Sequence, residues 1–548
     1  MAGSGNAQAR ALTSSTAVPL AALIAVGVGF GIHTLQYPWI FDDSFISYRF
    51  SANFAAGEGL VYNPGEYVEG FTTFLWVVVL GGLHWLSGVD LPVLGSGLAV
   101  LAGVACVVLT YALGRRLLVE PGESEVQSMW LGVLAAAITA ANASLARYAI
   151  TGMETAAFAA LVTLAILLAV RSTPTRGGWR PTRLELGLGL VLALTAMCRP
   201  EGMMYGGIIV LFCGWRLGPW AGLRVGAVFG LVFGAYFAWR YSYFGYPFPN
   251  TYYAKSGGSS DHWRLGVGYV EGHMWLHLGI LGFIGSVVAI VRRRPWGWLA
   301  AALIGAAAVT SARVGGDISP LYRFLVPVVP IGAVATLFAA RAAVLKLPTR
   351  GQAIAIAATV ALLCIHLVRA PGYQRFALLG QAPSPPDDRA KIERNARFST
   401  GYDQIGRWLD AAVPSDFVLA INAAGVIPFR TMRPTIDMLG LCDEHIAHVD
   451  RVEGPLGHEK HDPAYVLSRR PDLIIPALPL VLETNAPAPQ VAERMGRIWM
   501  RAMLPGDRAM LELPDFREYR LFVAQIGPTA YTAFFVRADR LAEMPGGG

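Results

Sequence analysis

Long hydrophobic runs separated by short polar segments fill the first two-thirds of the chain. A helix needs about 20 predominantly apolar residues to cross a bilayer, and fewer where protein covers part of it. The first run that satisfies this requirement covers about residues 17–36. The pattern therefore predicts a polytopic α-helical membrane protein with about 11 spans. The later predicted spans cover residues 91–114, 129–146, 155–171, 185–198, 203–215, 222–241, 275–291, 297–312, 322–340 and 351–369.

The apolar stretch 72–89 decides the direction of every later span. If it crossed the membrane, Arg115 and Arg116 would lie on the same side as residues 41–50, and each later loop would change sides. If it lies along the interface, as its histidine and tryptophans favour, the arginine-rich loops all fall on one side. The positive-inside rule makes that side cytoplasmic, with the N-terminus inside and the C-terminal segment outside. These loops contain Arg115 and Arg116; Arg171, Arg176, Arg180 and Arg183; Arg216 and Arg224; Arg292 to Arg294; and Arg341, Lys346 and Arg350.

The composition changes after residue 370, where the chain becomes charged, rich in proline and free of span-length runs. Short strand-like runs predict strands there, and a helix is predicted over 402–412. We therefore expect a transmembrane domain over residues 1–370 and an extracytoplasmic α/β domain over 371–548, joined by a linker near 381–386. The predicted strands cover residues 417–421, 435–439, 472–475, 519–525 and 532–536.

Composition agrees with a protein embedded in lipid. The chain is 54% hydrophobic and 15% charged, whereas soluble domains carry about 25% charged residues. Its formal net charge of +7 comes from the arginines of the loops, so we expect a lipid bilayer as partner and no nucleic acid. Of the five cysteines only Cys442 lies outside a predicted span, and no Cys/His spacing typical of a metal site is present.

The predicted external loops concentrate the ionisable side chains. Asp42 and Asp43 follow the first span directly. One of these carboxylates could act as base on an acceptor hydroxyl, or hold a divalent metal such as Mg²⁺ or Mn²⁺, while the other orients it or raises its pKa. The alternative is that both acids only favour the start of a short helix.

Cations in other external loops suit a phosphate group. Arg199 follows one very apolar segment, and its planar guanidinium matches a phosphate or a carboxylate of the site. Arg323 invites the same interpretation, and Arg240 or Lys255 could meet a lipid phosphate. The alternatives are that Arg199 pairs with Glu201 to neutralise a break between helices, and that the other cations anchor helix ends.

Aromatic residues between positions 246 and 255 could bind a sugar. Tyr252 and Tyr253 follow a turn with two prolines, and aromatic rings with hydroxyl groups suit the apolar face and polar edge of a sugar. An interfacial aromatic belt would give the same pattern.

Taken together, the loop motifs resemble the C-type (GT-C) integral-membrane glycosyltransferases that use polyprenyl-phosphate sugars. Within this group the chain is most similar to the terminal β-1,2-arabinofuranosyltransferases of mycobacterial cell-wall arabinan synthesis, over nearly its whole length. The motifs that carry the resemblance are Asp42–Arg49, Asn63–Glu66, Val68–Gly70, Gly152–Thr155, Arg199–Gly202, Pro249–Lys255, Gly315–Asp317, Tyr322–Phe324 and Arg433–Leu441.

The resemblance implies a catalytic aspartate in the first external loop, carried onto Asp42 or Asp43, and interfacial helices after it. It implies a lipid-linked sugar donor and a cell-envelope glycan acceptor held in part by the external domain. Arabinan-branch members retain the anomeric configuration, so an aspartate nucleophile is the alternative to a base. Donor phosphate is assigned to Arg199, Arg323, Lys255 and Arg240. Substrate contacts are assigned to Arg49, Glu69, Glu154, Glu201, Tyr252, Tyr253, Asn250, Asp317 and Tyr322.

We therefore expect a multi-pass glycosyltransferase of the inner (plasma) membrane that transfers arabinofuranose on the extracytoplasmic face. The alternatives are a GT-C transferase for another sugar such as mannose, a secondary transporter, and a non-catalytic envelope assembly protein. A transporter would place polar groups at the bilayer midplane on broken helices related by a repeat, and the chain shows no internal repeat.

Overall fold

The computed structural model describes residues 2–39, 41–173, 181–255, 260–317, 319–345, 347–369, 388–450, 452, 454, 459–477, 480–486 and 488–545. Arg176, Arg180, Lys346 and the predicted linker at 381–386 lie outside these residues. The chain forms two compact units, which we call the helical unit and the mixed unit. The helical unit contains Met1–Trp39, Ser96–Phe237 and Ser259–Ile392, and the mixed unit contains Ile40–Gly95, Ala238–Gly258 and Glu393–Gly548.

Within the described residues, five helical segments are long and apolar enough to cross a membrane, or up to seven if two bent pairs each count as one span. The fold class is thus confirmed as helical and of membrane type, and the count of 11 spans stays a prediction. The five are Thr16–Thr34 within α1 (Ala2–Thr34), α4 (Leu91–Leu117), α10 (Pro219–Phe244), Arg323–Val344 made of η1 (Arg323–Val328) and α15 (Val329–Val344), and α16 (Thr349–Arg369).

Two predicted spans are interrupted. The run at 129–146 becomes α5 (Glu125–Ala140) and α6 (Ala143–Ile150), bent by 67°. Asn142 ends the first helix and caps the second, because its side chain accepts a hydrogen bond from the Leu145 N–H at 3.0 Å. The run at 275–291 likewise divides into α12 (Ser260–Leu276) and α13 (Gly279–Val291), bent by 78° at Leu278, whose φ of 55° is left-handed.

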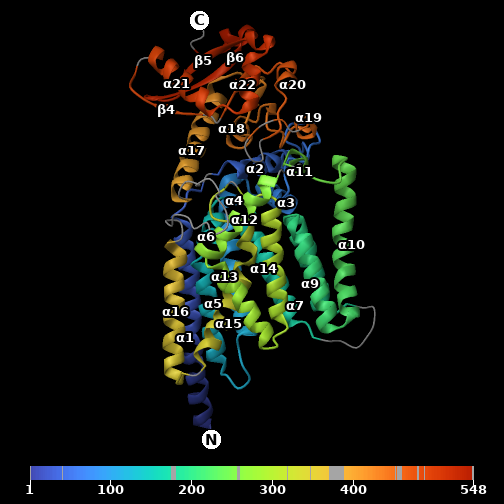
Figure 1. The fold of residues 1–548 in the computed structure, drawn as a ribbon, viewed down its shortest axis with the longest axis vertical. Helices are drawn as coiled ribbons and strands as arrows, with labels where there is room; N and C mark the ends of the chain where they lie inside the picture. The colour runs from blue at the N-terminus through green and yellow to red at the C-terminus, as the bar shows by residue number, and fades with distance from the viewer. Residues whose placement is uncertain are drawn as a thin grey trace. The chain divides into compact units, whose positions relative to one another are not determined.

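Residues 185–198 and 203–215 lie in two separate helices, α8 (Arg183–Cys198) and α9 (Glu201–Leu217), joined by a turn at Arg199. The remaining helices of this unit are α7 (Thr155–Arg171) and α14 (Trp296–Arg313). Glycine allows the closest packing, between α13 and α15, which lie side by side in Figure 1. A Cβ on Gly282 would come within 2.9 Å of the Gly332 Cα.

The mixed unit begins with two short helices that pack on each other, α2 (Asp42–Ala55) and α3 (Phe74–Ser87). The Ser51 hydroxyl donates to the Val77 carbonyl oxygen at 2.9 Å. A helix is thus present where the sequence predicts an interfacial one, and its end exposes Trp85 and Leu86. Its position along a membrane interface stays a prediction.

A six-stranded sheet forms the centre of the C-terminal region, in the order β2-β1-β3-β6-β4 with β5 also paired to β6. The first three strands are parallel, and β6 pairs antiparallel with β3, β4 and β5. Each of the five predicted strand regions coincides at least in part with a strand, and among the described residues only the two-residue β4 lacks a predicted counterpart. The strands are β1 (Leu419–Ile421), β2 (Thr435–Asp437), β3 (Leu473–Ile475), β4 (Leu482–Glu483), β5 (Tyr519–Gln525) and β6 (Ala530–Arg537).

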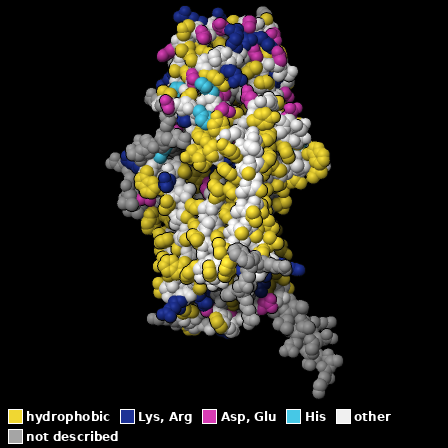
Figure 2. All heavy atoms as spheres, turned by 90° about the vertical axis from the view of Figure 1, so that its right-hand side faces the viewer, with side chains coloured by type: hydrophobic (Ala, Val, Ile, Leu, Met, Phe, Trp, Pro, Cys, Tyr) yellow, Lys and Arg dark blue, Asp and Glu magenta, His cyan; other side chains and the backbone are white. Residues whose placement is uncertain are grey.

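Helices surround this sheet (Figure 1). The predicted helix at 402–412 is the end of the longer α17 (Asp388–Ala412), and its Trp408 ring stacks on Phe534 of β6 at 5.9 Å. Charged side chains gather over this C-terminal part in Figure 2, whereas hydrophobic side chains cover most of the visible helical unit. The other elements are α11 (Asn250–Lys255), α18 (Val426–Thr431), α19 (Glu444–His448), α20 (Pro463–Ser468), α21 (Ala488–Ala502), α22 (Pro505–Glu512), η3 (Pro514–Glu518) and η4 (Ala538–Glu543).

Candidate active site

Two sets of charged side chains occupy the loops of the helical unit. In the first set, glutamates of the loop after α4 form ion pairs with arginines from two other segments. Arg294, before α14, pairs with Glu120, and Arg341 of α15 pairs with Glu123 at 2.6 Å. Three loops that the sequence assigns to the arginine-rich side therefore meet, as the sidedness argument requires of them.

The second set is built around Arg199, in the turn between α8 and α9. Its guanidinium donates to Glu154 Oε1 at 2.5 Å, just before α7, and to Glu201 Oε1 at 2.8 Å, at the start of α9. Arg199 and Glu154 are buried, at 9% and 2% exposure. Arg199 therefore does pair with Glu201. It also pairs with Glu154, a residue that the sequence analysis assigned to the substrate.

Arg323 extends this set. Its Nε lies 2.7 Å from Asp317 Oδ2, and its guanidinium lies 5.3 Å from the centre of the Phe324 ring. The Arg199 guanidinium lies 5.6 Å from the same ring. Phe324 thus brings the two predicted phosphate-binding arginines of this unit to one aromatic ring. We call Arg199, Arg323, Glu154, Glu201 and Asp317 the arginine–carboxylate cluster.

The formal charge of this cluster is −1, since it holds two arginines and three carboxylates. Each arginine already contacts a carboxylate. An incoming phosphate would therefore have to exchange with a carboxylate partner, because the two compete for the same N–H donors.

A pocket adjoins the cluster through the segment 321–325. Tyr322, at φ 48°, packs its ring 4.9 Å from His277 and 5.7 Å from His273, and Leu325 lines the pocket itself. The space between the pocket walls, counted together with the part that is open to solvent, is about 590 Å³. Its lining comes from α5, α12, α13, α14, η1, α15 and α16.

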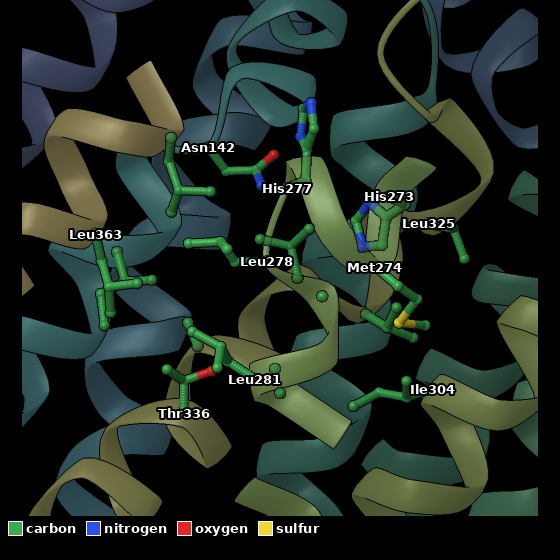
Figure 3. Close-up of a pocket in the computed structure, with 18 residues that line it drawn as sticks. Asn142, His273, Met274, His277, Leu278, Leu281, Ile304, Leu325, Thr336 and Leu363 are labelled. Carbon is green, nitrogen blue, oxygen red and sulfur yellow. The ribbon is translucent and has the colours of Figure 1, made fainter. Parts of the chain in front are cut away.

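The lining of this pocket is mostly aliphatic. Figure 3 shows Asn142, His277 and His273 toward one part of it and Leu281 and Thr336 toward another. Its hydrophobic walls and few polar groups are typical of a site for an aliphatic chain with a polar end.

The mixed unit holds the aspartate pair in the first turn of α2. Val426, at the start of α18, donates its N–H to Asp42 Oδ1 at 2.8 Å, and Gly425 packs so closely on Asp42 that a Cβ there would collide with it. Burial, together with the charges of Asp43 and Asp437, raises the pKa of Asp42 to about 7, although the hydrogen bond from Val426 lowers it. Asp43 is exposed.

Asp437 belongs to the Arg433–Leu441 motif, and the sequence analysis assigned no role to this residue. It ends β2, is buried, and accepts the N–H groups of Leu439 at 3.0 Å and Cys442 at 2.8 Å. Burial raises its pKa to about 6. Among the residues that the structure describes, no three His, Cys, Asp or Glu side chains lie close enough to hold a metal ion.

Arg49 is fully buried on α2, and its donors are engaged by the protein. It binds the carbonyl oxygens of Tyr62 at 2.7 Å, Pro428 at 2.6 Å and Arg433 at 2.7 Å, and Asn63 Oδ1 at 3.0 Å. These contacts tie α2 to the segment from the start of α18 to β2, and Val426, the first residue of this segment, is the one that binds Asp42.

Arg240 and Glu69 form a buried ion pair in the mixed unit. Arg240 Nε donates to Glu69 Oε1 at 3.0 Å, and its Nη1 donates to the carbonyl oxygens of Tyr246 and Pro247 at 3.2 and 3.0 Å. The Glu69 carbonyl oxygen in turn accepts the Asn250 N–H at 3.0 Å. Of the four predicted phosphate-binding cations, Lys255 is the exposed one.

Comparisons with known proteins agree with the predicted resemblance. Residues 390–522 match a family described as "Domain of unknown function (DUF8728)". A terminal β-(1→2)-arabinofuranosyltransferase of Mycobacterium tuberculosis is 31% identical over 283 residues, which are 50% of this chain and 44% of that protein. Its namesake of Corynebacterium glutamicum is 28% identical over 346 residues, 54% of this chain and 48% of that protein. The chain thus spans less than half the length of these curated relatives.

Solved structures share the fold. ArnT from Cupriavidus metallidurans in the apo state has a TM-score of 0.53 and 14% identity, covering 97% of this chain and 99% of ArnT. ArnT bound to undecaprenyl phosphate has a TM-score of 0.52 and 13% identity, with 94% and 97% coverage. The Archaeoglobus fulgidus oligosaccharyltransferase has a TM-score of 0.52 and 11% identity, with 94% and 74% coverage. The chain therefore has the GT-C-type membrane fold of these proteins and is similar over half its length to two terminal β-(1→2)-arabinofuranosyltransferases.

Proposed function

We propose that the protein is a membrane glycosyltransferase that moves arabinofuranose from a polyprenyl-phosphate donor to a cell-envelope glycan on the extracytoplasmic face of the plasma membrane. The names of the two curated relatives support the reaction and the sugar, and the ArnT structure with undecaprenyl phosphate supports the class of donor. In this proposal the N-terminus is cytoplasmic, residues 1–370 form the transmembrane catalytic domain, and residues 371–548 form the extracytoplasmic domain.

The observation that carries the proposal is the segment Tyr322–Leu325. Its four residues contribute the Arg323 guanidinium to the arginine–carboxylate cluster and place Tyr322 and Leu325 at the mostly aliphatic pocket. A lipid-linked sugar phosphate needs this combination, a cationic group for the phosphate next to an apolar space for the chain.

In the proposed mechanism Arg199 and Arg323 bind the donor phosphate as carboxylate partners release them. Charge builds on this phosphate as the bond to the sugar breaks, so fixed guanidinium groups stabilise the transition state more than the ground state. Arg240 and Lys255 remain the other predicted phosphate ligands, with Lys255 the more accessible of the two.

Asp42 is the proposed base that takes the proton of the acceptor hydroxyl. A carboxylate with a pKa of about 7 is a stronger base than an ordinary aspartate and is still ionised in about half of the molecules at neutral pH. The Val426 N–H fixes its orientation. If the configuration of the sugar is retained, the same carboxylate could instead attack the sugar as a nucleophile.

We propose positioning roles for Arg49, Glu69 and Asn250. Their buried contacts with main-chain groups and with Arg240 fix the positions of α2, which begins at Asp42, and of α11. Glu154, Glu201 and Asp317 would hold the phosphate-binding arginines in the empty site. Tyr252, Tyr253 and Tyr322 remain predicted substrate contacts.

The direct test uses the purified protein in lipid nanodiscs with a polyprenyl-phosphoryl arabinofuranose and an arabinofuranosyl oligosaccharide. We expect release of polyprenyl phosphate and an acceptor longer by one sugar, detected by mass spectrometry. Faster transfer from the corresponding mannose donor would identify mannose, instead of arabinofuranose, as the sugar. In sealed proteoliposomes, movement of donor across the membrane with no glycosylated product would instead support a transporter. If neither transfer nor movement of the donor is detected, the non-catalytic assembly protein is the alternative that remains.

Filling the pocket provides a second prediction. Leu363 lines it from α16, a helix whose other faces are largely exposed, so Leu363→Trp should place an indole in the pocket with little strain elsewhere. We expect the KM for a long-chain polyprenyl donor to rise about ten-fold or more, since the lost apolar burial is worth about 25 cal/mol per Å². A donor with a short chain should be affected less.

Leu362→Trp is the matched control, because Leu362 is the neighbouring residue and is 68% exposed. It should leave the KM for both donors unchanged. Equal effects of Leu363→Trp on long-chain and short-chain donors would contradict the assignment of the pocket to the lipid chain.

A further inference from the structure

Five aromatic rings of the mixed unit form a continuous ridge. They come from the segment around α11 and from α19, and we call Tyr246, Phe248, Tyr252, Tyr253 and His448 the aromatic ridge. The His448 ring lies 4.5 Å from the Tyr253 ring and 4.9 Å from the Tyr246 ring, measured between centroids. The Phe248 and Tyr252 rings lie 4.6 Å apart. Phe248 and Tyr252 are 48% and 53% exposed, so the ridge offers ring faces to the surroundings.

Hydrogen bonds hold the ridge in place. The Tyr246 hydroxyl donates to Glu444 Oε1 at 2.7 Å, which joins the α10–α11 loop to α19. The Asn250 side-chain amide donates to the carbonyl oxygens of Gly440 and Asp443, both at 3.0 Å. The ring positions are therefore set before any ligand binds, which lowers the entropic cost of binding.

The composition of the ridge favours a sugar-binding surface over one that inserts into the apolar part of a membrane. Residues 243–255 contain six tyrosine or phenylalanine residues and no Leu, Ile, Val or Met. A surface that inserts into lipid gains from large aliphatic side chains, and this stretch has no Leu, Ile, Val or Met. Glu444 and the exposed Lys255 add polar groups beside the rings. Ring faces with hydrogen-bonding groups at their edges match the apolar face and the hydroxyl edge of a sugar ring.

The loop that anchors the ridge also carries a group of the aspartate site. Asp437, whose charge raises the pKa of Asp42, begins the loop whose carbonyl groups at 440 and 443 bind Asn250. An oligosaccharide on the ridge would thus rest on the same loop that borders the proposed base. This continuity favours the acceptor over the lipid-linked donor as the occupant.

We propose that the aromatic ridge is a binding site for the acceptor glycan, which lies along it with its sugar rings stacked on Phe248, Tyr252, Tyr253 and His448. This inference rests on the proposed function for the identity of the glycan as an acceptor. The binding itself requires no donor and no transfer.

The test measures binding of a synthetic arabinofuranosyl oligosaccharide to the full-length protein in nanodiscs, without donor, by isothermal titration calorimetry. We expect the double variant Phe248→Ala/Tyr252→Ala to raise the dissociation constant about ten-fold or more, since two stacking contacts are lost. Tyr252→Phe keeps the ring and should stay within about three-fold of the wild type.

Tyr241→Ala is the matched control, because Tyr241 is 51% exposed on α10 and lies outside the ridge. Its affinity for the oligosaccharide should equal that of the wild type. Unchanged affinity in the Phe248→Ala/Tyr252→Ala double variant, or an equal loss of affinity in Tyr252→Phe, would overturn the proposal. Ridge-dependent binding in a protein that transfers no sugar would leave the ridge assignment intact and refute the proposed reaction alone.

Discussion

Replacing Asp42 with asparagine is expected to lower the rate of sugar transfer by about 10²–10⁴-fold, the usual contribution of a positioned base. Asparagine has nearly the same shape and can still accept the Val426 N–H, so the start of α18 keeps its partner. It cannot take a proton. The transfer assay described above measures the effect at saturating donor and acceptor.

The pH dependence of transfer should report the same carboxyl group. Since the pKa of Asp42 is raised to about 7, the wild-type rate should rise as the pH rises through about 7 and level off above it. Asp43→Asn removes a charge that raises the pKa of Asp42, so it should move this midpoint to lower pH while leaving the plateau rate within about ten-fold.

Thermal unfolding separates this catalytic role from a structural one. A raised carboxyl pKa means that the folded chain holds the proton more tightly than the unfolded chain, in which aspartate titrates near about 3.9. The resulting stabilisation is full below that pH and is lost as the pH rises through about 7. The Tm of Asp42→Asn relative to wild type should therefore increase from pH 5 to pH 8. Full activity of Asp42→Asn, or a Tm loss at pH 8 that accounts for its inactivity, would contradict the assignment.

Local patterns were enough to predict the strands but only part of the helix geometry. The strands β5 and β6 are short runs rich in apolar and aromatic residues, so their local composition identified them. The breaks at Asn142 and Leu278 occur inside apolar runs, where hydrophobicity continues while the backbone turns. Asn142 could have been recognised as a cap, whereas nothing about leucine signals a left-handed φ.

The candidate site shows the same division between local and long-range information. The Arg199–Glu201 contact spans two residues, and the sequence already offered it as an alternative. The hydrogen bonds of Arg49 reach residues nearly 400 positions away, so its buried role could not be read from its own motif. Asp437 was overlooked because its importance lies in its charge near Asp42, which depends on how α2 packs within the mixed unit.

The second large effect is expected at Arg199, where Arg199→Gln should lower both stability and donor affinity. The substitution leaves Glu154 and Glu201 buried without their shared cation. Removing one partner of a buried ion pair costs about 3–5 kcal/mol of unfolding free energy. Loss of a guanidinium from the phosphate site should in addition raise the KM for the polyprenyl donor by about ten-fold or more.

Arg224→Gln controls for the cost of breaking a buried pair. Arg224 on α10 binds Glu185 of α8 at 2.6 Å, and both residues are buried, at 5% and 1% exposure. It belongs to the predicted cytoplasmic set, so this variant should lose stability comparably while keeping the donor KM of the wild type. Equal donor KM values for Arg199→Gln and Arg224→Gln would limit Arg199 to a structural role.

Glu201→Gln should act on the donor in the opposite direction. It changes the formal charge of the arginine–carboxylate cluster from −1 to zero and removes a carboxylate that competes with phosphate for the Arg199 N–H groups. We therefore expect a lower donor dissociation constant than in wild type, measured by titrating polyprenyl phosphate into the nanodisc-embedded protein. Weaker donor binding by both Arg199→Gln and Glu201→Gln would indicate that the intact ion pair supports the fold of the site, whereas opposite signs would identify Arg199 as a cation that exchanges its carboxylate for the phosphate of the donor.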